Sequence, residues 1–423
     1  MASKELGSSA KQSPSSNDWR ISIDQTFTRV FSPLYSLAPS KHSKPGSSRF
    51  SLLSCAHIRV ISLAGTLLFS AMLPSVAATK QIDSRRIAIA SPAAKISKVN
   101  SVPQNPAFTF IDSDNRSGLK EYRLRANGLS VLLAERHTAP VTVVMVVFRV
   151  GSRNEAVGYT GSTHFLEHMM FKGTSVHDPL KKTGIDDVLK PLGGYNNATT
   201  FYDRTNYYEV IPAKDLAVCI ELEADRMRHA LLRASDRAAE MTVVRNELER
   251  SDNFASSILD TQIFATAFRE HPYHHPVIGW RSDVEGVPIE RLRQFYNDFY
   301  YPNNATLVVI GDFKTADALA MVAKEFSKVA ALRKPFPKVY TIEPPQEGER
   351  RFVVNHGEEL PKLTLGFHIP KATDKDTYPL EILASILGDE KRQSSRLYKR
   401  LVDSGLASEA SCANYSLRDP GLF

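Results

Sequence analysis

The stretch GSTHFLEHMMFKGT, residues 161–174, carries two histidines and a glutamate within five positions of a mainly apolar run. On an α-helix, positions i, i+3 and i+4 share one face, so His164, Glu167 and His168 would project together while the apolar residues pack. Two imidazoles one turn apart can bind one Zn²⁺, and a carboxylate beside them can hold a water on the metal. The order His-x-x-Glu-His is the inverse of the His-Glu-x-x-His zinc motif. The alternative is a chance pattern on a partly buried helix, and a metal site needs a third ligand.

A second acidic segment can supply that ligand. The sequence AEMTVVRNELERSDN contains Glu240, Glu247 and Glu249, and the first two, seven positions apart, share one face of a continuing helix. A carboxylate is the expected complement to two imidazoles at a zinc site that keeps one position for water. Taken alone, however, a run of charges is more typical of a solvated helix face.

The net charge of +7 belongs to the beginning of the chain. Residues 1–126 carry 17 Lys or Arg against 7 Asp or Glu, which leaves the remainder slightly acidic, so we expect no nucleic-acid surface. The chain has three cysteines, Cys55, Cys219 and Cys412. This number excludes a disulfide framework and leaves room for one incidental bridge.

An uncharged run, VISLAGTLLFSAMLPSVAAT at residues 60–79, follows several basic residues and ends in small ones, which is typical of a signal peptide. We expect cleavage near Ala77–Thr79 and export, to a bacterial periplasm. The 59 residues in front are far longer than an ordinary leader. A mitochondrial presequence or an uncleaved membrane anchor therefore remains an alternative, the anchor being the one expected membrane contact.

Strand and helix signals alternate through the folded part. The apolar runs GLSVLLAER and PVTVVMVVFRVG predict adjacent antiparallel strands, and ATTFYDRTNYYEVIP predicts an edge or hairpin strand. Helices are expected between Lys214 and Arg250, a strand over 304–313 and a helix after it. A Pro-rich joint, residues 332–350, then separates two domains.

Beyond the joint the pattern repeats. The segments VLLAERHTAP and FVVNHGEELP, at 131–140 and 352–361, share length, strand character and a terminal proline, and each precedes another apolar strand. In the first copy, the histidine motif begins 24 residues after the terminal proline. The same distance after the terminal proline of the second copy falls within LEILASILGDE, a predicted helix without histidine. The second copy is therefore expected to be structural.

These signals predict an α+β protein of two similar halves, each an antiparallel sheet packed with helices, the second half incomplete. The expected domains are a targeting region (1–79), a flexible linker (80–118), a domain that carries the His and Glu motifs (119–331), an inter-domain linker (332–350) and a truncated second domain of similar pattern (351–423).

From about Tyr122 onward the sequence resembles the pitrilysin/insulinase family of zinc metallopeptidases, particularly its bacterial branch related to the mitochondrial processing peptidase. The resemblance rests on the two segments that hold the His and Glu motifs and on further blocks, namely GGYNNATTFYDRTNYYEVIP, EADRM, PYHHPVIG and YYPNNATLVVIGD. It implies one zinc per chain bound by His164, His168 and Glu247, with Glu167 as general base, Glu240 supporting the site and Asn197 and Ala198 on a strand that takes up an extended peptide by β-addition.

The expected function is that of a zinc metalloendopeptidase acting on peptides or unfolded protein segments. In the family a second unit closes over the site, so we expect a homologous partner subunit or a homodimer. Compared with the first half, the second half stops early, after only 72 residues from Phe352. The alternative function is a non-catalytic or inactive truncated subunit of a peptidase-like assembly.

Overall fold

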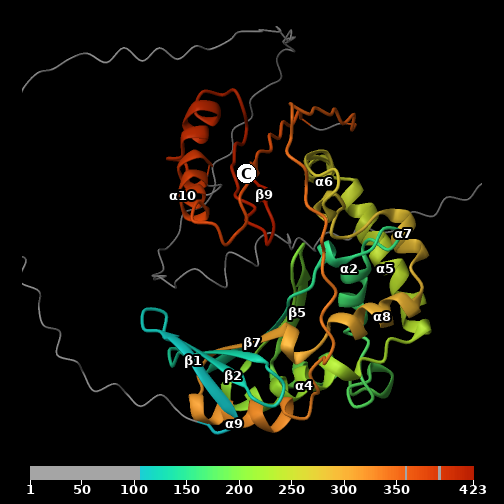
Figure 1. Ribbon diagram of the computed structural model, residues 1–423, viewed down its shortest axis with the longest axis vertical. Coiled ribbons are helices and arrows are strands. Elements are labelled where there is room, and N and C mark those ends of the chain that lie inside the picture. Colours follow the sequence, from blue (N-terminus) through green and yellow to red (C-terminus); the bar gives the residue numbers. More distant parts are fainter. Residues whose placement is uncertain (1–104, 358–359, 389–391) are drawn as a thin grey trace, which may run out of the picture. The chain divides into compact units, whose positions relative to one another are not determined.

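The computed structural model describes residues 105–357, 360–388 and 392–423. Our predictions of a targeting segment and of most of the first linker lie outside these residues. Seven strands form the main sheet, in the spatial order β1-β2-β3-β7-β4-β6-β5 (Figure 1). They are β1 (Phe108–Asp114), β2 (Leu119–Leu124), β3 (Ser130–Glu135), β4 (Val141–Phe148), β5 (Tyr195–Thr200), β6 (Thr205–Pro212) and β7 (Ala305–Gly311).

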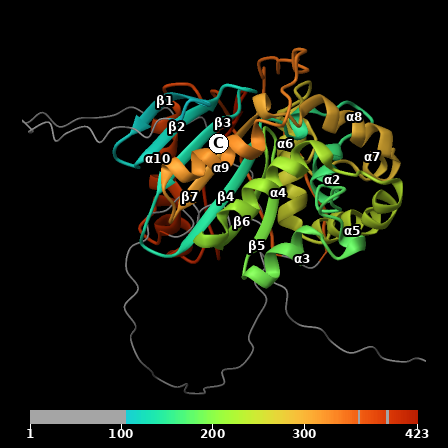
Figure 2. The ribbon, with the colours of Figure 1, turned by 90° about the horizontal axis from the view of Figure 1, so that it is seen from below.

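The helices are α2 (Ser162–Met169), α3 (Ile185–Leu189), α4 (Leu216–His229), α5 (Ala234–Asp252), α6 (Ala255–Ala267), α7 (Arg281–Gly286), α8 (Ile289–Phe299), α9 (Thr315–Phe326) and α10 (Thr377–Gly388). Two of them, α4 and α9, pack on the sheet and on each other, and α2, α5, α7 and α8 gather beside the β5 end of the sheet (Figures 1 and 2). No helix in the part of the chain that the structure describes is long and apolar enough to cross a membrane.

The centre of the sheet differs from our prediction. We expected β3 and β4 to be neighbours, but β7 lies between them, parallel to β3 and antiparallel to β4. The five-residue link 136–140 is long enough to pass over one intervening strand, since neighbouring strands lie about 4.8 Å apart. Along β7 the side chains alternate between buried and half-buried, so this strand gains more at the centre of the sheet than at an edge.

The first linker ends earlier than we expected. Strand β1 lies within the segment 80–118 and pairs with β2, with Phe108 opposite Leu124. The strand signal in the sequence is weak because every residue of β1 after Phe108 is exposed and its last three residues, Asp112–Asp114, are polar. Two other predictions of secondary structure are confirmed: β5 and β6 form a hairpin with β5 at the edge, and two helices, α4 and α5, cover the segment from Lys214 to Arg250.

The second half forms less regular structure than we predicted. Helix α10 is confirmed, but the predicted strands at 352–361 and 362–369 form a ladder only at β8 (His368–Ile369), which pairs with β9 (Gly421–Leu422). The described residues between Phe352 and Gly366 form no strand. A strand is stable only with neighbours to accept its hydrogen bonds, so the apolar pattern alone did not suffice. Cys219 and Cys412 are both free.

Candidate active site

Helix α2 presents the motif residues as the spacing predicts. Phe165, Leu166 and Met169 are fully buried in the main core, which fixes one face of the helix. His164, Glu167 and His168 therefore lie together on the other face. The two imidazole rings are 4.8 Å apart between centroids and nearly perpendicular.

Helix α5 brings the carboxylates to the same place. Glu247 Oε2 lies 3.6 Å from His164 Nε2 and 3.5 Å from His168 Nε2. Glu240, two turns earlier, lies 2.9 Å from His168 Nδ1 through Oε1. Glu249 is not part of the cluster, because it pairs with Arg281 at 2.9 Å. The two acidic residues on one face of α5 thus contact the histidines, and the third lies elsewhere.

The geometry fits a single zinc ion. One ligand atom each of His164, His168 and Glu247 lies within 4.8 Å of the other two. Ligands at about 2.1 Å from a tetrahedral zinc are roughly 3.4 Å from one another, close to the two distances to the Glu247 oxygen. His164 Nδ1 is buried without a hydrogen-bond partner among the described residues. Two nitrogens and one carboxylate oxygen are also the donor set of a catalytic zinc that keeps a position for water.

The two histidines differ in pKa and therefore in protonation state. Burial is the main cause that lowers the pKa of His164 to about 4, so its imidazole is neutral. Burial acts to lower the pKa of His168 too, but hydrogen bonds to Glu240 and Glu247 outweigh it and raise the pKa to about 9. A metal at His168 Nε2 must therefore displace a proton, while Glu240 keeps the Nδ1–H donor in place.

Glu167 lies beside the two histidines but its carboxylate is not one of the three converging ligands. Burial raises its pKa to about 7, although a hydrogen bond from Thr200 and the charge of His168 act in the opposite direction. The Thr200 hydroxyl donates to Glu167 Oε2. A carboxylate with a pKa near neutrality can both accept and return a proton at physiological pH.

The candidate substrate strand is next to this carboxylate. Asn197 and Ala198 lie on β5, which forms one edge of the main sheet, and Thr200 is at the end of the same strand. Asn197 Nδ2 donates to Tyr195 Oη at 3.1 Å, and Asn197 Oδ1 accepts from the N–H of Ala198 at 2.8 Å. The structure thus places an edge strand beside Glu167 of α2, which Thr200 at the end of that strand contacts.

Two contacts at the site were missed from the sequence. Thr200 lies in the quoted block GGYNNATTFYDRTNYYEVIP, yet nothing in its local pattern indicates that its hydroxyl reaches α2. Lys172 forms an ion pair with Glu240, which sits between it and His168. Only its spacing, four residues after His168, could have suggested a position near the site.

Comparisons with known proteins bear on the family to which the chain belongs. Residues 130–280 match the model of the insulinase family, peptidase family M16, and residues 286–423 match that of the peptidase M16 inactive domain. A zinc protease of Helicobacter pylori named PqqE is 35% identical over 302 residues, 70% of this chain and 67% of that protein. A probable beta subunit of the mitochondrial-processing peptidase of Arabidopsis thaliana is 24% identical, and the match covers 70% of this chain and 57% of that one.

Solved structures give the same result. The crystal structure of a protease from Helicobacter pylori matches with a TM-score of 0.66 and 32% identity, covering 72% of this chain and 73% of that chain. A peptidase M16 inactive domain from Pseudomonas fluorescens, 16% identical with a TM-score of 0.61, shares the fold. Both kinds of comparison, together with the inverted motif on α2, show that the chain belongs to peptidase family M16, the insulinase family.

Proposed function

We propose that this chain is a zinc-dependent metalloendopeptidase that binds one Zn²⁺ through His164, His168 and Glu247. The observation that carries the proposal is the convergence of these three ligand atoms beside a fourth buried side chain, Glu167, whose pKa is about 7. The naming of similar proteins as zinc proteases supports it.

When bound, zinc would acidify a water molecule and polarise the scissile carbonyl. Glu167 accepts the proton of the attacking water and then returns it to the leaving amine. The hydrogen bond from Thr200 to Oε2 holds this carboxylate in place. Glu240 holds the ring of His168 through Nδ1 and keeps Nε2 directed at the ligand cluster.

The proposed substrate is an extended peptide or an unfolded protein segment. The outer edge of β5 offers backbone donors and acceptors to one more strand, and Asn197 and Ala198 lie on that strand. A peptide added there would run past Thr200 and Glu167. We also propose export of the chain and a homologous partner subunit or a homodimer. The leader pattern supports export, and the word subunit in the name of the plant relative supports a partner.

The test combines metal analysis with peptide turnover, in the presence and absence of a candidate partner subunit. We expect Glu167→Gln to retain one zinc per chain and to lose at least about 100-fold in turnover, since it removes the proton acceptor but no ligand. His168→Ala and Glu247→Ala should lose zinc and turnover together. Glu249→Gln is the matched control on the same helix, because its carboxylate pairs with Arg281.

Each outcome separates the alternatives. Zinc binding without turnover under every condition would favour a non-catalytic subunit, in agreement with the name of the model that matches residues 286–423. Turnover that survives in Glu167→Gln would refute the role of this carboxylate. A wild-type chain without zinc would refute the proposal as a whole.

A further inference from the structure

Glu155 lies in the loop between β4 and α2, and none of the roles above includes it. Its side chain is fully buried. The residue is nine positions before the first histidine of the motif, too far to share a helix turn with it. Burial raises the pKa of Glu155 to about 8, and hydrogen bonds act in the opposite direction. The buried carboxyl group therefore needs hydrogen-bond partners from elsewhere in the fold, since an unpaired buried polar group is costly.

Those partners are backbone N–H groups at the start of α2. Gly161 donates to Glu155 Oε2 and Thr163 donates to Oε1, both at 2.7 Å. The first N–H groups of a helix have no acceptor within the helix, and usually the side chain of the preceding residue caps them. Gly161 occupies that position here and has no side chain to do so. Glu155 takes over the capping from outside the helix.

The start of α2 has little freedom to move around this carboxylate. Gly161 has a φ of +82°, and a Cβ at this position would lie 2.4 Å from the carbonyl oxygen of Ile278. The preceding residue, Thr160, donates its hydroxyl to Asp283 at 2.8 Å and accepts the N–H of Trp280 at 2.9 Å. The helix therefore begins at a fixed point against the segment 278–283.

The nearest basic group does not compete for the carboxylate. His275 Nδ1 is 3.8 Å from Glu155 Oε2, beyond hydrogen-bond distance. Burial is the main cause that lowers the pKa of His275 to about 4, so its ring is neutral. The two N–H groups of α2 are thus the donors that hold the Glu155 side chain in the described structure.

A small rotation of α2 would separate the metal ligands. The helix has only eight residues, and His164 directly follows the capped residue Thr163. A histidine Nε2 lies roughly 6 Å from the helix axis, so a rotation of about 10° moves it by about 1 Å. Zinc–ligand distances tolerate only about 0.2 Å. The contact that sets the start of the helix therefore also sets the separation of His164 and His168 from Glu247 on α5.

We propose that Glu155 is a positioning residue for the metal centre: by capping α2 from outside, it fixes the helix rotation at which both histidines meet Glu247. The inference rests on the proposed function, because it needs His164 and His168 to be metal ligands. It assigns Glu155 no contact with the metal or the substrate.

The main test variant is Glu155→Gln, which keeps the shape of the side chain but places an amide NH₂ against one of the two N–H donors. Glu135→Gln is the matched control. Glu135 caps another helix from outside, accepting the N–H of Thr315 at 2.6 Å at the start of α9. Helix α9 carries no candidate ligand, so this variant measures the loss of a similar cap without an effect on the site.

Two measurements apply to the folded full chain and need no peptidase activity. We expect Glu155→Gln to weaken zinc binding, measured by competition with a chelator, by about 10- to 100-fold, as for other residues that orient metal ligands. We also expect the visible absorption spectrum of the Co²⁺-loaded variant to change, because it reports ligand geometry. Glu135→Gln should leave both unchanged even if its unfolding temperature falls.

If Glu155→Gln does not fold, Glu155→Asp replaces it. The aspartate keeps the carboxyl group but is one methylene shorter and reaches one N–H at most, so we expect an intermediate loss of zinc affinity. Wild-type affinity and an unchanged cobalt spectrum in a folded Glu155 variant would overturn the inference and leave the proposed function intact. A wild-type chain that binds no zinc would overturn both.

Discussion

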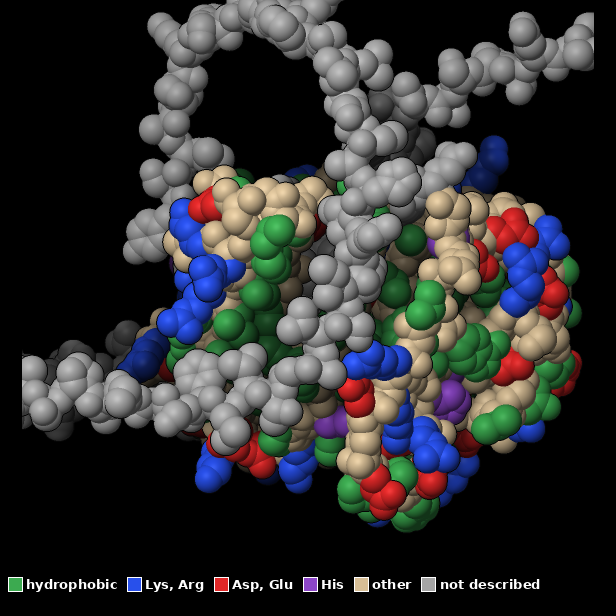
Figure 3. Space-filling view, turned by 90° about the horizontal axis from the view of Figure 1, so that it is seen from above, with side chains coloured by type: hydrophobic (Ala, Val, Ile, Leu, Met, Phe, Trp, Pro, Cys, Tyr) green, Lys and Arg blue, Asp and Glu red, His purple; other side chains and the backbone are tan. Residues whose placement is uncertain are grey.

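Residues 105–331 and residues 351–423 carry similar apolar sequences in very different surroundings. The main core takes its buried members from Phe108 to Val329 and includes Leu307 and Val309 on β7, both 0% exposed. In the second region, Leu363 is 84% exposed and Leu365 67%. Hydrophobic side chains are plainly visible at the surface in Figure 3. An apolar segment is buried only if other elements cover it, and the described residues cover the strands of the first region but leave Leu363 and Leu365 exposed.

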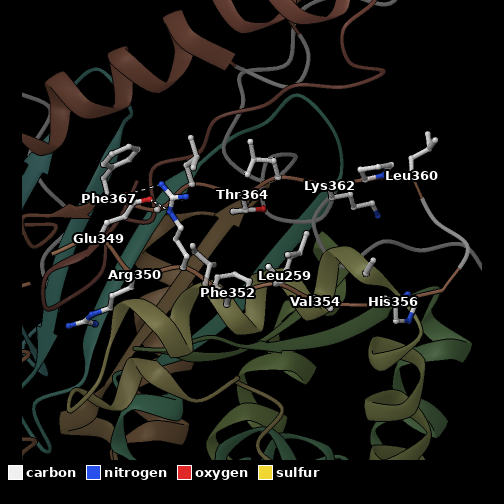
Figure 4. A pocket seen from close by; sticks show the side chains of 18 of the residues that line it. Leu259, Glu349, Arg350, Phe352, Val354, His356, Leu360, Lys362, Thr364 and Phe367 are labelled. Atoms are coloured by element: carbon white, nitrogen blue, oxygen red, sulfur yellow. Dashed lines mark hydrogen bonds and ion pairs between the residues drawn. The ribbon is translucent and has the colours of Figure 1, made fainter. Parts of the chain in front are cut away.

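The groove beside α6 shows this difference in detail. It has a volume of about 900 Å³ and lies between α6 and the extended segments around Phe352 and Thr364 (Figure 4). Leu259 lines it from α6, and Val354 and Phe367 line it from the extended segments. Leu360, Leu363 and Leu365, which also line the groove, are highly exposed, so the described residues leave this groove uncovered.

The largest expected difference between the two regions is in the cost of losing one leucine. Leu307→Ala should lower the free energy of unfolding by about 2–5 kcal/mol, because it leaves a cavity at the centre of the sheet. Leu365→Ala should change it by less than about 0.5 kcal/mol. Urea unfolding followed by circular dichroism measures both. Equal losses would mean that Leu365 is buried in solution and that the comparison fails.

The last residues of the second region are an exception, because they are buried against the first region. Leu417 and Leu422 are buried against Phe264, Phe268 and Tyr273 of the first region. Next to them, Asp419 Oδ2 accepts hydrogen bonds from Arg153 Nε at 2.6 Å and His271 Nε2 at 3.0 Å. The last residues of the sequence are therefore attached to the first region by charge as well as by packing.

Asp419→Asn should loosen this attachment. A hydrogen bond to a charged group contributes about 1.5–3 kcal/mol, so local opening should become about 10- to 100-fold more frequent. Hydrogen exchange of the paired amides of Phe367 and Phe423 measures it. Asp403→Asn is the control, because its ion pair with Lys399 is exposed and local. Unchanged exchange in Asp419→Asn would show that packing alone holds the segment.

The same attachment should weaken in acid. Burial is the main cause that lowers the pKa of His271, whose Nδ1 accepts the N–H of Tyr273, so the folded chain binds a proton less readily than the unfolded chain. Burial acts to raise the pKa of Asp419, but hydrogen bonds from His271 and Arg153 outweigh it and lower the pKa. The contributions of His271 and Asp419 to the stability of this attachment are both complete above about pH 6.5. As the pH falls, the contribution of His271 is lost first and that of Asp419 second. Protection factors, which correct for the slower intrinsic exchange at lower pH, should fall between pH 7.5 and 5 more steeply for Phe367 and Phe423 than for core amides, through the contribution of His271.

The smallest effect on stability is expected from replacing an exposed leucine of the second region. The same substitution should clearly change self-association. Leu363→Lys should leave the unfolding free energy within about 0.5 kcal/mol and reduce self-association, measured by sedimentation velocity. Leu180→Lys is the control, since Leu180 is also highly exposed but lies in the first region. If both variants reduce association equally, the apolar surface of the second region has no special role.

What could be predicted from the sequence depended on local spacing. The helix period predicts that His164 and His168 share one helix face and that Glu240 and Glu247 share another. The structure contains both helices. The contacts of Thr200 and Glu155 could not be predicted, because each depends on how separate segments meet. Residue spacing within one segment gives no information about contacts between segments that are far apart in the sequence.

The second region shows the opposite limit. The apolar runs after Phe352 have the composition of strands, and the pattern alone predicted them as such, but pairing partners decide whether a ladder forms. Asp419 lies in a segment without any strong pattern, yet it contacts Arg153 and His271 far away in the sequence. Charge pairing over such distances is invisible to periodicity.

The position of β7 between β3 and β4 also bears on the order in which the chain can fold. Ser130 of β3 is opposite Thr306 of β7, so the central strands cannot complete their pairing until a segment more than 150 residues later is available. At about 5–20 residues per second, a ribosome needs roughly 8–30 seconds to make the intervening chain. All the candidate zinc ligands are synthesised before the sheet beneath them can close. Pairings this distant also make folding slow, and during that interval the bare edges of β3 and β4 are exposed to wrong partners.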